Sequence, residues 1–330
     1  MTSRPAADGS VAAAIALAGC GVAWLVLLIV SVLATLGAST DGALAVTETA
    51  YGLPAVIFAA LLAGVAVSQA VRRSADRWLG PAVVLRAVVT VACGGLVGAG
   101  AAAGVVVGDG RGGSAVAILG WALLAGGVTG GALVGLHRRA GVLAGAVAAA
   151  ALVVAVLMTL RELFTATLLD LFGAGDTPAS VLAAQSRLTW TAALLAGALA
   201  GVVAFGRLHL AVRRSGRPLP WPAYLIAGGG AGLLLLIAEL ITRVGGAQLL
   251  DLARSFSDSD DTFQALANAA RINSALVVVF AGAFTALLCL GRTLPGRAAA
   301  DGPVAGRPPG DQPAPERAMS DRAELDLGSR

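Results

Sequence analysis

Two ionisable side chains, Glu239 and Arg86, lie inside long apolar stretches of the sequence. Charged groups inside a membrane are costly and are often functional, so a carboxylate at Glu239 could bind a cation or a proton. Glu239 also precedes Arg243 by one helical turn, and that spacing favours an ion pair. Arg86 lies near enough to the end of its stretch for the guanidinium to reach the membrane surface. The sequence leaves the functional and the structural role of both residues open.

Two arginines, Arg187 and Arg271, each precede an apolar stretch at matching positions. Guanidinium groups bind carboxylates and phosphates, so this pair could hold an anionic group of a lipid or substrate. Asp170 and Asp251 occupy equivalent places in two copies of the word "LLDL". We therefore expect a ligand site that includes Glu239, Arg187, Arg271, Asp170 and Asp251. The alternative is an ion-pair network that only satisfies the helix ends.

Catalytic and metal chemistry has little support. The two histidines, His137 and His209, fall in connections predicted to be cytoplasmic, so neither can serve as a base within the membrane or outside it. The chain has no lysine, which excludes a Walker loop and a Schiff base. The Asp-rich run at 257–261 lacks the Gly and the distant Glu of a calcium-binding loop. The three cysteines have no partner at ligand spacing: Cys20, Cys93 and Cys289. We predict no catalytic residue, no cofactor and no metal, and a protein that is not an enzyme.

The elements that position these residues are long apolar helices. Hydrophobic residues make up 57% of the chain and charged residues 13%, and the mean hydropathy is +0.84. Apolar runs of about 18 residues or more indicate membrane spans. The sequence therefore predicts an all-α, polytopic integral membrane bundle in contact with the lipid bilayer. About eight transmembrane helices are expected: 11–36, 51–71, 80–108, 114–136, 140–160, 188–206, 220–242 and 272–291.

The arginines between the predicted spans set the orientation. Alternate connections are rich in arginine, and they hold Arg72, Arg73, Arg77, Arg138, Arg139, Arg207, Arg213, Arg214, Arg217, Arg292 and Arg297. The other connections have few arginines, and those are mixed with acids. The positive-inside rule then predicts a multi-pass plasma-membrane protein with both termini in the cytoplasm. Because topology accounts for the arginine clusters, the sequence pI of about 9.6 does not predict nucleic-acid binding.

The last four spans are expected to form two copies of one hairpin, at about 140–207 and 220–292. The "LLDL" words, Arg187 and Arg271, and the two later "GR" pairs all align after a small insertion. Helical spacing of apolar residues extends the fifth helix past the membrane, and Thr177 before Pro178 predicts the start of the next helix. Asp261, followed three residues later by Gln264, predicts the start of the last helix. We expect these connections to build a small extracytoplasmic helical cap.

The domain organisation follows from these elements. A short cytoplasmic N-terminus, 1–10, precedes an N-terminal membrane half at 11–136. The C-terminal half at 137–294 contains the repeated hairpins. The segment 295–330 is rich in Pro, Gly, Ala and charge, and it lacks the apolar residues that offset the entropy of ordering. It is expected to be a disordered cytoplasmic tail.

Glycines recur at four-residue spacing, as in Gly94 and Gly98 or Gly127 and Gly131. Such spacing lets helices approach closely in lipid. The alternative is that Gly-rich helices bend to line a transport pathway.

Two functions stay open. The first is a carrier or permease-like transporter for a small or amphiphilic molecule, because internal repeats are frequent in transporters. The second is a non-catalytic accessory or scaffolding protein that binds a membrane-protein partner, or forms a homo-oligomer, through its cap or tail. The lack of acidic residues and histidines at mid-membrane depth favours this second function. The sequence leans towards the carrier.

Overall fold

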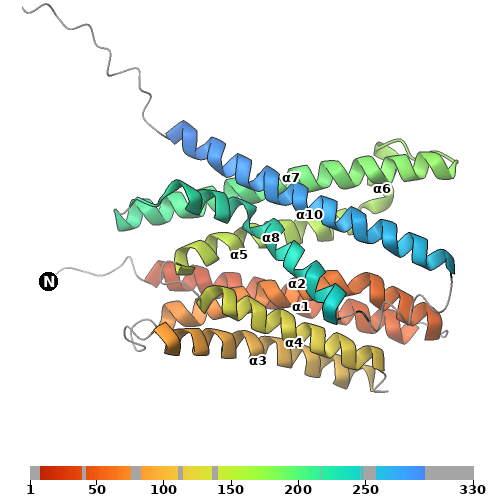
Figure 1. Cartoon of the computed structure of the whole chain (residues 1–330), viewed down its shortest axis with the longest axis horizontal. Helices are drawn as coiled ribbons and strands as arrows, with labels where there is room; N and C mark the ends of the chain where they lie inside the picture. Colours follow the sequence, from red (N-terminus) through yellow and green to blue (C-terminus); the bar gives the residue numbers. More distant parts are fainter. Residues whose placement is uncertain are drawn as a thin grey trace, which may run out of the picture. The chain divides into compact units, whose positions relative to one another are not determined.

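The chain folds into long, roughly antiparallel helices (Figure 1). The computed structural model describes residues 8–38, 42–75, 83–110, 114–135, 140–216, 218–245, 247 and 258–293, and this part of the chain is helical and contains no strand. The helices are α1 (Asp8–Ala38), α2 (Gly42–Ala75), α3 (Val83–Asp109), α4 (Ser114–Gly135), α5 (Ala140–Leu163), α6 (Thr165–Leu171), α7 (Pro178–Ser215), α8 (Trp221–Gly245) and α10 (Asp258–Thr293).

Eight of these helices are long and apolar enough to cross a membrane, and each corresponds to one predicted span. The all-α membrane bundle is therefore confirmed. The two longest of the described helices are α7, with 38 residues, and α10, with 36. At 1.5 Å per residue they measure about 57 Å and 54 Å, against about 30 Å of hydrocarbon. Part of each helix must therefore project from the hydrocarbon or tilt within it.

Local signals in the sequence explain the helix ends around α6 and the start of α7. The Thr177 hydroxyl accepts a hydrogen bond from the Ser180 amide at 3.2 Å, and Pro178 is the first residue of α7, which confirms this predicted start. The fifth helix continues past Leu163 as expected, but a turn at Phe164 separates α5 from α6. Gly173, with φ of +84°, follows α6 in a conformation that suits glycine. The predicted start of the last helix is wrong, because α10 already begins at Asp258.

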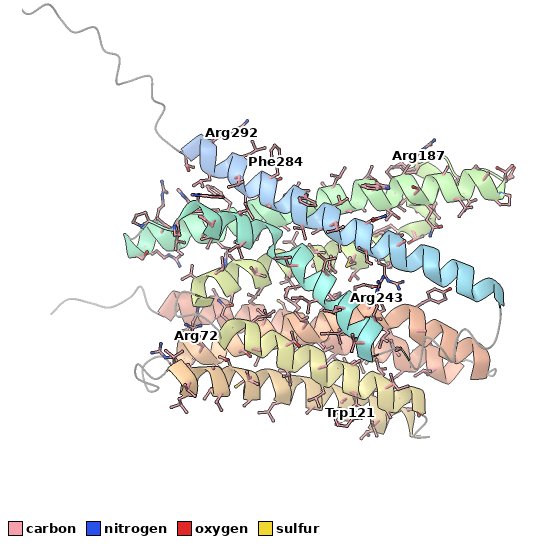
Figure 2. The ribbon with its side chains drawn as sticks, in the orientation of Figure 1. Arg72, Trp121, Arg187, Arg243, Phe284 and Arg292 are labelled. Atoms are coloured by element: carbon pink, nitrogen blue, oxygen red, sulfur yellow. The ribbon has the colours of Figure 1, made fainter. Side chains whose placement is uncertain are left out.

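The bundle has two ends, which we name by their residues. The basic end is where α2 finishes near Arg72 and where α10 finishes near Arg292, on the left of Figures 1 and 2. The connection end is the opposite one, where α5 and α8 finish and α6 lies. The names imply no side of the membrane.

Helix α2 lies at the centre of the bundle. In its most apolar window 78% of the residues are buried, against 17% for α3 on the outside. It contacts α1, α3, α4, α5 and α8. In the C-terminal half α5 packs against α7, α8 against α10, and α7 against α10. Each of the two predicted hairpins therefore has its two helices side by side.

Glycines allow the closest contacts between helices. A Cβ atom added to Gly94 on α3 would overlap the carbonyl oxygen of Gly127 on α4 and approach the Gly131 amide nitrogen to 2.8 Å. In the C-terminal half, Gly228 of α8 faces Gly282 of α10 in the same way. These contacts are the close packing that small residues provide in lipid.

This packing makes a prediction for two glycines of the same helix. Gly94→Ala should lower the stability by about 1–3 kcal/mol, because the added methyl group meets backbone atoms that cannot rotate away. Gly104→Ala is the control, because nothing lies within 4 Å of the Cβ position there. Thermal unfolding of both variants in the same detergent measures the difference. Equal melting temperatures for the two variants would contradict the packing.

Candidate ligand-binding site

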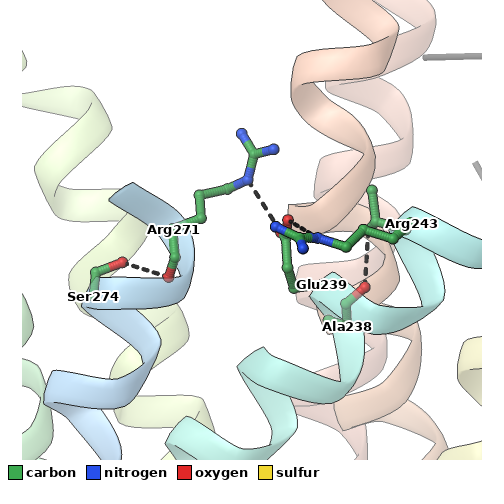
Figure 3. Close-up of polar contacts among 6 residues, drawn as sticks. Ala238, Glu239, Arg243, Arg271 and Ser274 are labelled. Carbon is green, nitrogen blue, oxygen red and sulfur yellow. Dashed lines mark hydrogen bonds and ion pairs between the residues drawn. The ribbon is translucent and has the colours of Figure 1, made fainter. Parts of the chain in front are cut away.

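Glu239 lies between two arginines near the connection end (Figure 3). Its carboxylate accepts hydrogen bonds from Arg243 Nε at 3.3 Å and from Arg271 Nε at 3.1 Å, one on each oxygen. The Glu239 side chain is only 7% exposed, while the two arginines are partly exposed. This charge triad, Glu239, Arg243 and Arg271, joins α8 to α10. It confirms the ion pair expected between Glu239 and Arg243.

The triad changes the chemistry expected of Glu239. Both carboxylate oxygens already accept hydrogen bonds from guanidinium groups, so a bound cation would have to displace an arginine.

The other predicted site residues lie apart from the triad. Arg187 of α7 is exposed, and its Nη1 donates to the carbonyl oxygen of Phe172 at 3.5 Å. It therefore contacts the end of the α6 segment. Asp170 on α6 is exposed, and within the described residues no ion pair joins it to Arg243 or Arg271. Asp251 lies outside the described residues. The structure thus brings together Glu239 and Arg271 of the five predicted residues.

A small cavity lies near the triad, where α5, α7, α8 and α10 meet. Its volume is about 50 Å³. Three of the lining residues are polar: Arg161 of α5, Thr189 of α7 and Ser274 of α10. The Ser274 hydroxyl donates to the Arg271 carbonyl oxygen at 2.9 Å, so the cavity begins one turn from the triad (Figure 3). The other lining residues are apolar: Val154, Leu157, Met158, Ala192, Ala193, Ala196, Leu235 and Val278.

Arg161 is the residue that the sequence analysis did not single out for the site. Its Nε is buried and has no hydrogen-bond partner among the described residues. The acid paired with it in this part of the chain is Glu162, whose Oε1 lies 3.9 Å from that nitrogen, beyond hydrogen-bond range. Glu162 is 74% exposed, so water screens its charge. The signal that could have found Arg161 is an arginine at the end of an apolar run with no carboxylate one helical turn away.

A second polar cluster, also missed, lies near the basic end of α2. Ser68, Gln69 and Arg72 are buried there. Each donates to a backbone carbonyl oxygen of a different helix: Thr90 of α3 at 2.8 Å, Gly141 of α5 at 3.0 Å and Val134 of α4 at 2.7 Å, respectively. The cluster ties α2 to its neighbours. Arg86, on the same side of the bundle, is half-buried.

Comparison with known proteins suggests no function for these residues. No family model, no curated protein and no solved structure matches the chain. In the described residues no group of three or more His, Cys, Asp and Glu side chains could hold a metal ion. The arrangement near the connection end is a small cavity with one arginine, two hydroxyl groups and an apolar part.

The triad predicts different effects for two neutralised glutamates. Glu239→Gln should cost about 1–3 kcal/mol of stability, because it leaves two partly buried guanidiniums without their shared carboxylate. Glu162→Gln, at an exposed carboxylate of the same end, should change stability by less than about 0.5 kcal/mol. Thermal unfolding in detergent compares the two. A Glu239→Gln variant as stable as the native chain would show that the triad does not hold α8 to α10.

Proposed function

We propose that this integral membrane protein is a carrier for a small or amphiphilic molecule, and that the cavity between α5, α7, α8 and α10 is its binding site. The observation that carries the proposal is the division of the cavity into a polar and an apolar part. Arg161 and Val154 line it seven residues apart, which is about 10 Å along α5. The polar part lies towards the connection end, and the apolar part lies deeper in the bundle. An amphiphile in a bilayer has the same orientation.

The position of the cavity supports the proposal as well. Two of its walls come from the first hairpin, α5 and α7, and two come from the second, α8 and α10. Transporters built from repeats commonly bind substrate at the interface of the repeats. The proposed duplication of these hairpins and the position of the cavity therefore agree with each other.

The size of the cavity limits what it can hold. Pockets that enclose a drug-sized ligand measure about 300–1,000 Å³, and this one is about 50 Å³. A cavity of this size suits one end of an amphiphile, while the remainder lies along the bundle surface. A larger cargo would require the two hairpins to separate. The triad joins α8 to α10 within the second hairpin, so it would move with that hairpin as a unit.

An accessory role is the second candidate, and a separate observation favours it. Large apolar side chains are exposed on the helices near the connection: Leu163 of α5, Leu171 of α6 and Leu182 of α7, with Leu171 78% exposed. The start of α7 precedes the span predicted at 188–206. Exposed apolar side chains there could contact a membrane-protein partner, a second copy of the chain or the bilayer surface.

Retention of a small molecule tests the carrier proposal. The protein is purified in lipid nanodiscs and weighed by native mass spectrometry as the native chain, as Ala193→Phe and as Leu195→Phe. Ala193→Phe should eliminate a retained small molecule, because the larger side chain fills the cavity. Leu195→Phe is the control, since Leu195 is exposed on the same helix and does not line the cavity. A stoichiometric second polypeptide without a retained small molecule would instead support the accessory role.

We also propose that the basic end faces the cytoplasm, in accord with the positive-inside rule. In a background without native cysteines, Ala174→Cys near α6 should react with a membrane-impermeant maleimide in intact cells. Ser215→Cys, at the exposed end of α7, should react only after the cells are permeabilised. The reverse labelling pattern would contradict this orientation.

A further inference from the structure

We propose that the cavity recognises an oxyanion head group, such as a phosphate or carboxylate, on a single-chain amphiphile from the bilayer leaflet at the connection end, with Arg161 as its principal contact. This inference rests on the proposed function and names the ligand class of the same site. It replaces Arg187 and Arg271, the pair that the sequence indicates for an anionic group.

The first argument is the distribution of charge. Of the arginines considered for an anion, Arg271 shares Glu239 with Arg243, and Arg187 contacts a backbone carbonyl oxygen. Arg161 lines the cavity, and its nearest carboxylate in the described residues is beyond hydrogen-bond range. The charge of Arg161 therefore favours a negatively charged ligand in this space.

The second argument is the hydrogen bond that Arg161 lacks. A buried N–H group without a partner is unfavourable, since it has lost its water and gained no acceptor. The Arg161 Nε is such a group, although the whole side chain is 30% exposed. An anionic oxygen in the cavity would supply the missing acceptor and would form a charge-assisted hydrogen bond.

Two hydroxyl groups can complete the site. Ser274 and Thr189 line the same cavity from α10 and α7. Ser274 donates to the Arg271 carbonyl oxygen, and Thr189 donates to the Gln185 carbonyl oxygen, each on its own helix. A hydroxyl hydrogen can rotate, and a helix carbonyl oxygen that loses this bond keeps its backbone partner. Both hydroxyls can therefore donate to an oxyanion without leaving a buried group unsatisfied.

The third argument is size and depth. One water needs about 10–15 Å³ of such space, so about 50 Å³ holds roughly three or four atoms of that size, which is the scale of a carboxylate or phosphate. The apolar lining, with Val154 and Leu235, continues the site away from Arg161. Arg161 is in the last turn of α5, where the apolar span ends. The head group of a leaflet amphiphile lies at this depth, and its chain extends inward.

Binding of three probes separates the parts of this inference. Hexadecyl phosphate carries both the anion and the apolar chain. Hexadecanol carries the chain alone, and inorganic phosphate is the anion alone. Each is titrated into the full chain in phosphatidylcholine nanodiscs, and bound copies are counted by native mass spectrometry. The variants are Arg161→Gln, Arg161→Lys, Arg187→Gln as the matched arginine control, and Ala193→Phe.

The native chain should bind one hexadecyl phosphate. It should bind hexadecanol about tenfold more weakly, because the alcohol lacks the anionic acceptor. Arg161→Gln should reduce hexadecyl phosphate binding by a similar factor and leave hexadecanol binding unchanged. Arg161→Lys should retain most of the affinity, and Arg187→Gln should retain all of it. The thermal stability of the native chain should rise with hexadecyl phosphate, while that of Arg161→Gln should not.

The remaining outcomes distinguish the inference from the function on which it rests. Equal binding of hexadecyl phosphate by Arg161→Gln and the native chain would overturn the inference, but the cavity site would stand if Ala193→Phe still abolished binding. The native chain could fail to bind either probe that carries an apolar chain, or Ala193→Phe could leave that binding unchanged. Either result would overturn the proposed site and the inference together. Inorganic phosphate could instead displace hexadecyl phosphate, with a binding affinity that depends equally on Arg161. That result would overturn the bilayer as the source of the ligand, and it would keep an oxyanion as the group that Arg161 binds.

Discussion

The glycine contacts of α10 with α7 and α8 set the geometry of the C-terminal half. In lipid no hydrophobic force draws helices together, so close approach depends on small residues, and Gly282 approaches backbone atoms of Gly228 and Gly197. This register of the helices aligns two pairs of residues. Glu239 is eleven residues from Gly228, and Arg271 is eleven residues from Gly282, so in antiparallel helices both lie about 16 Å from the contact. Thr189 is eight residues before Gly197, and Ser274 is eight residues before Gly282. These two polar residues of the cavity lining therefore also lie at the same height along the bundle.

The charges near the connection end follow from that alignment. One buried carboxylate is placed within reach of two arginines, and it uses both of its oxygens for them. A guanidinium on α5 is then left without a comparable acid, since the neighbouring Glu162 is mostly exposed to water. A buried guanidinium N–H that has no acceptor is unfavourable for folding alone. Its position is easier to understand if a ligand supplies the counter-charge.

The apolar runs alone were enough to predict eight spans, because a long uncharged apolar run has few alternatives to a membrane helix. The start of α7 was also predictable, since Thr177 and Pro178 act within one turn. The start of α10 was not predictable in this way. The helix begins at Asp258, before the Asp261 and Gln264 pattern that indicates a capping box. Within the site, the pairing of Glu239 with Arg243 is local and was expected. The choice of Arg271 over Arg187 depends on which helices approach each other, and a single sequence does not encode that choice in any short pattern.

The buried polar side chains near the two ends of the bundle make different contacts. Near the basic end, Ser68, Gln69 and Arg72 donate to backbone carbonyl oxygens of three neighbouring helices, so their hydrogen bonds require α2 to keep its place. Near the connection end the charged groups meet side chains of other helices or line a cavity. Side-chain pairs can separate and re-form with a ligand at less cost than buried contacts to backbone groups. A rearrangement that admits a ligand is therefore easier at the connection end of α8 and α10 than around α2, and both of these helices line the cavity.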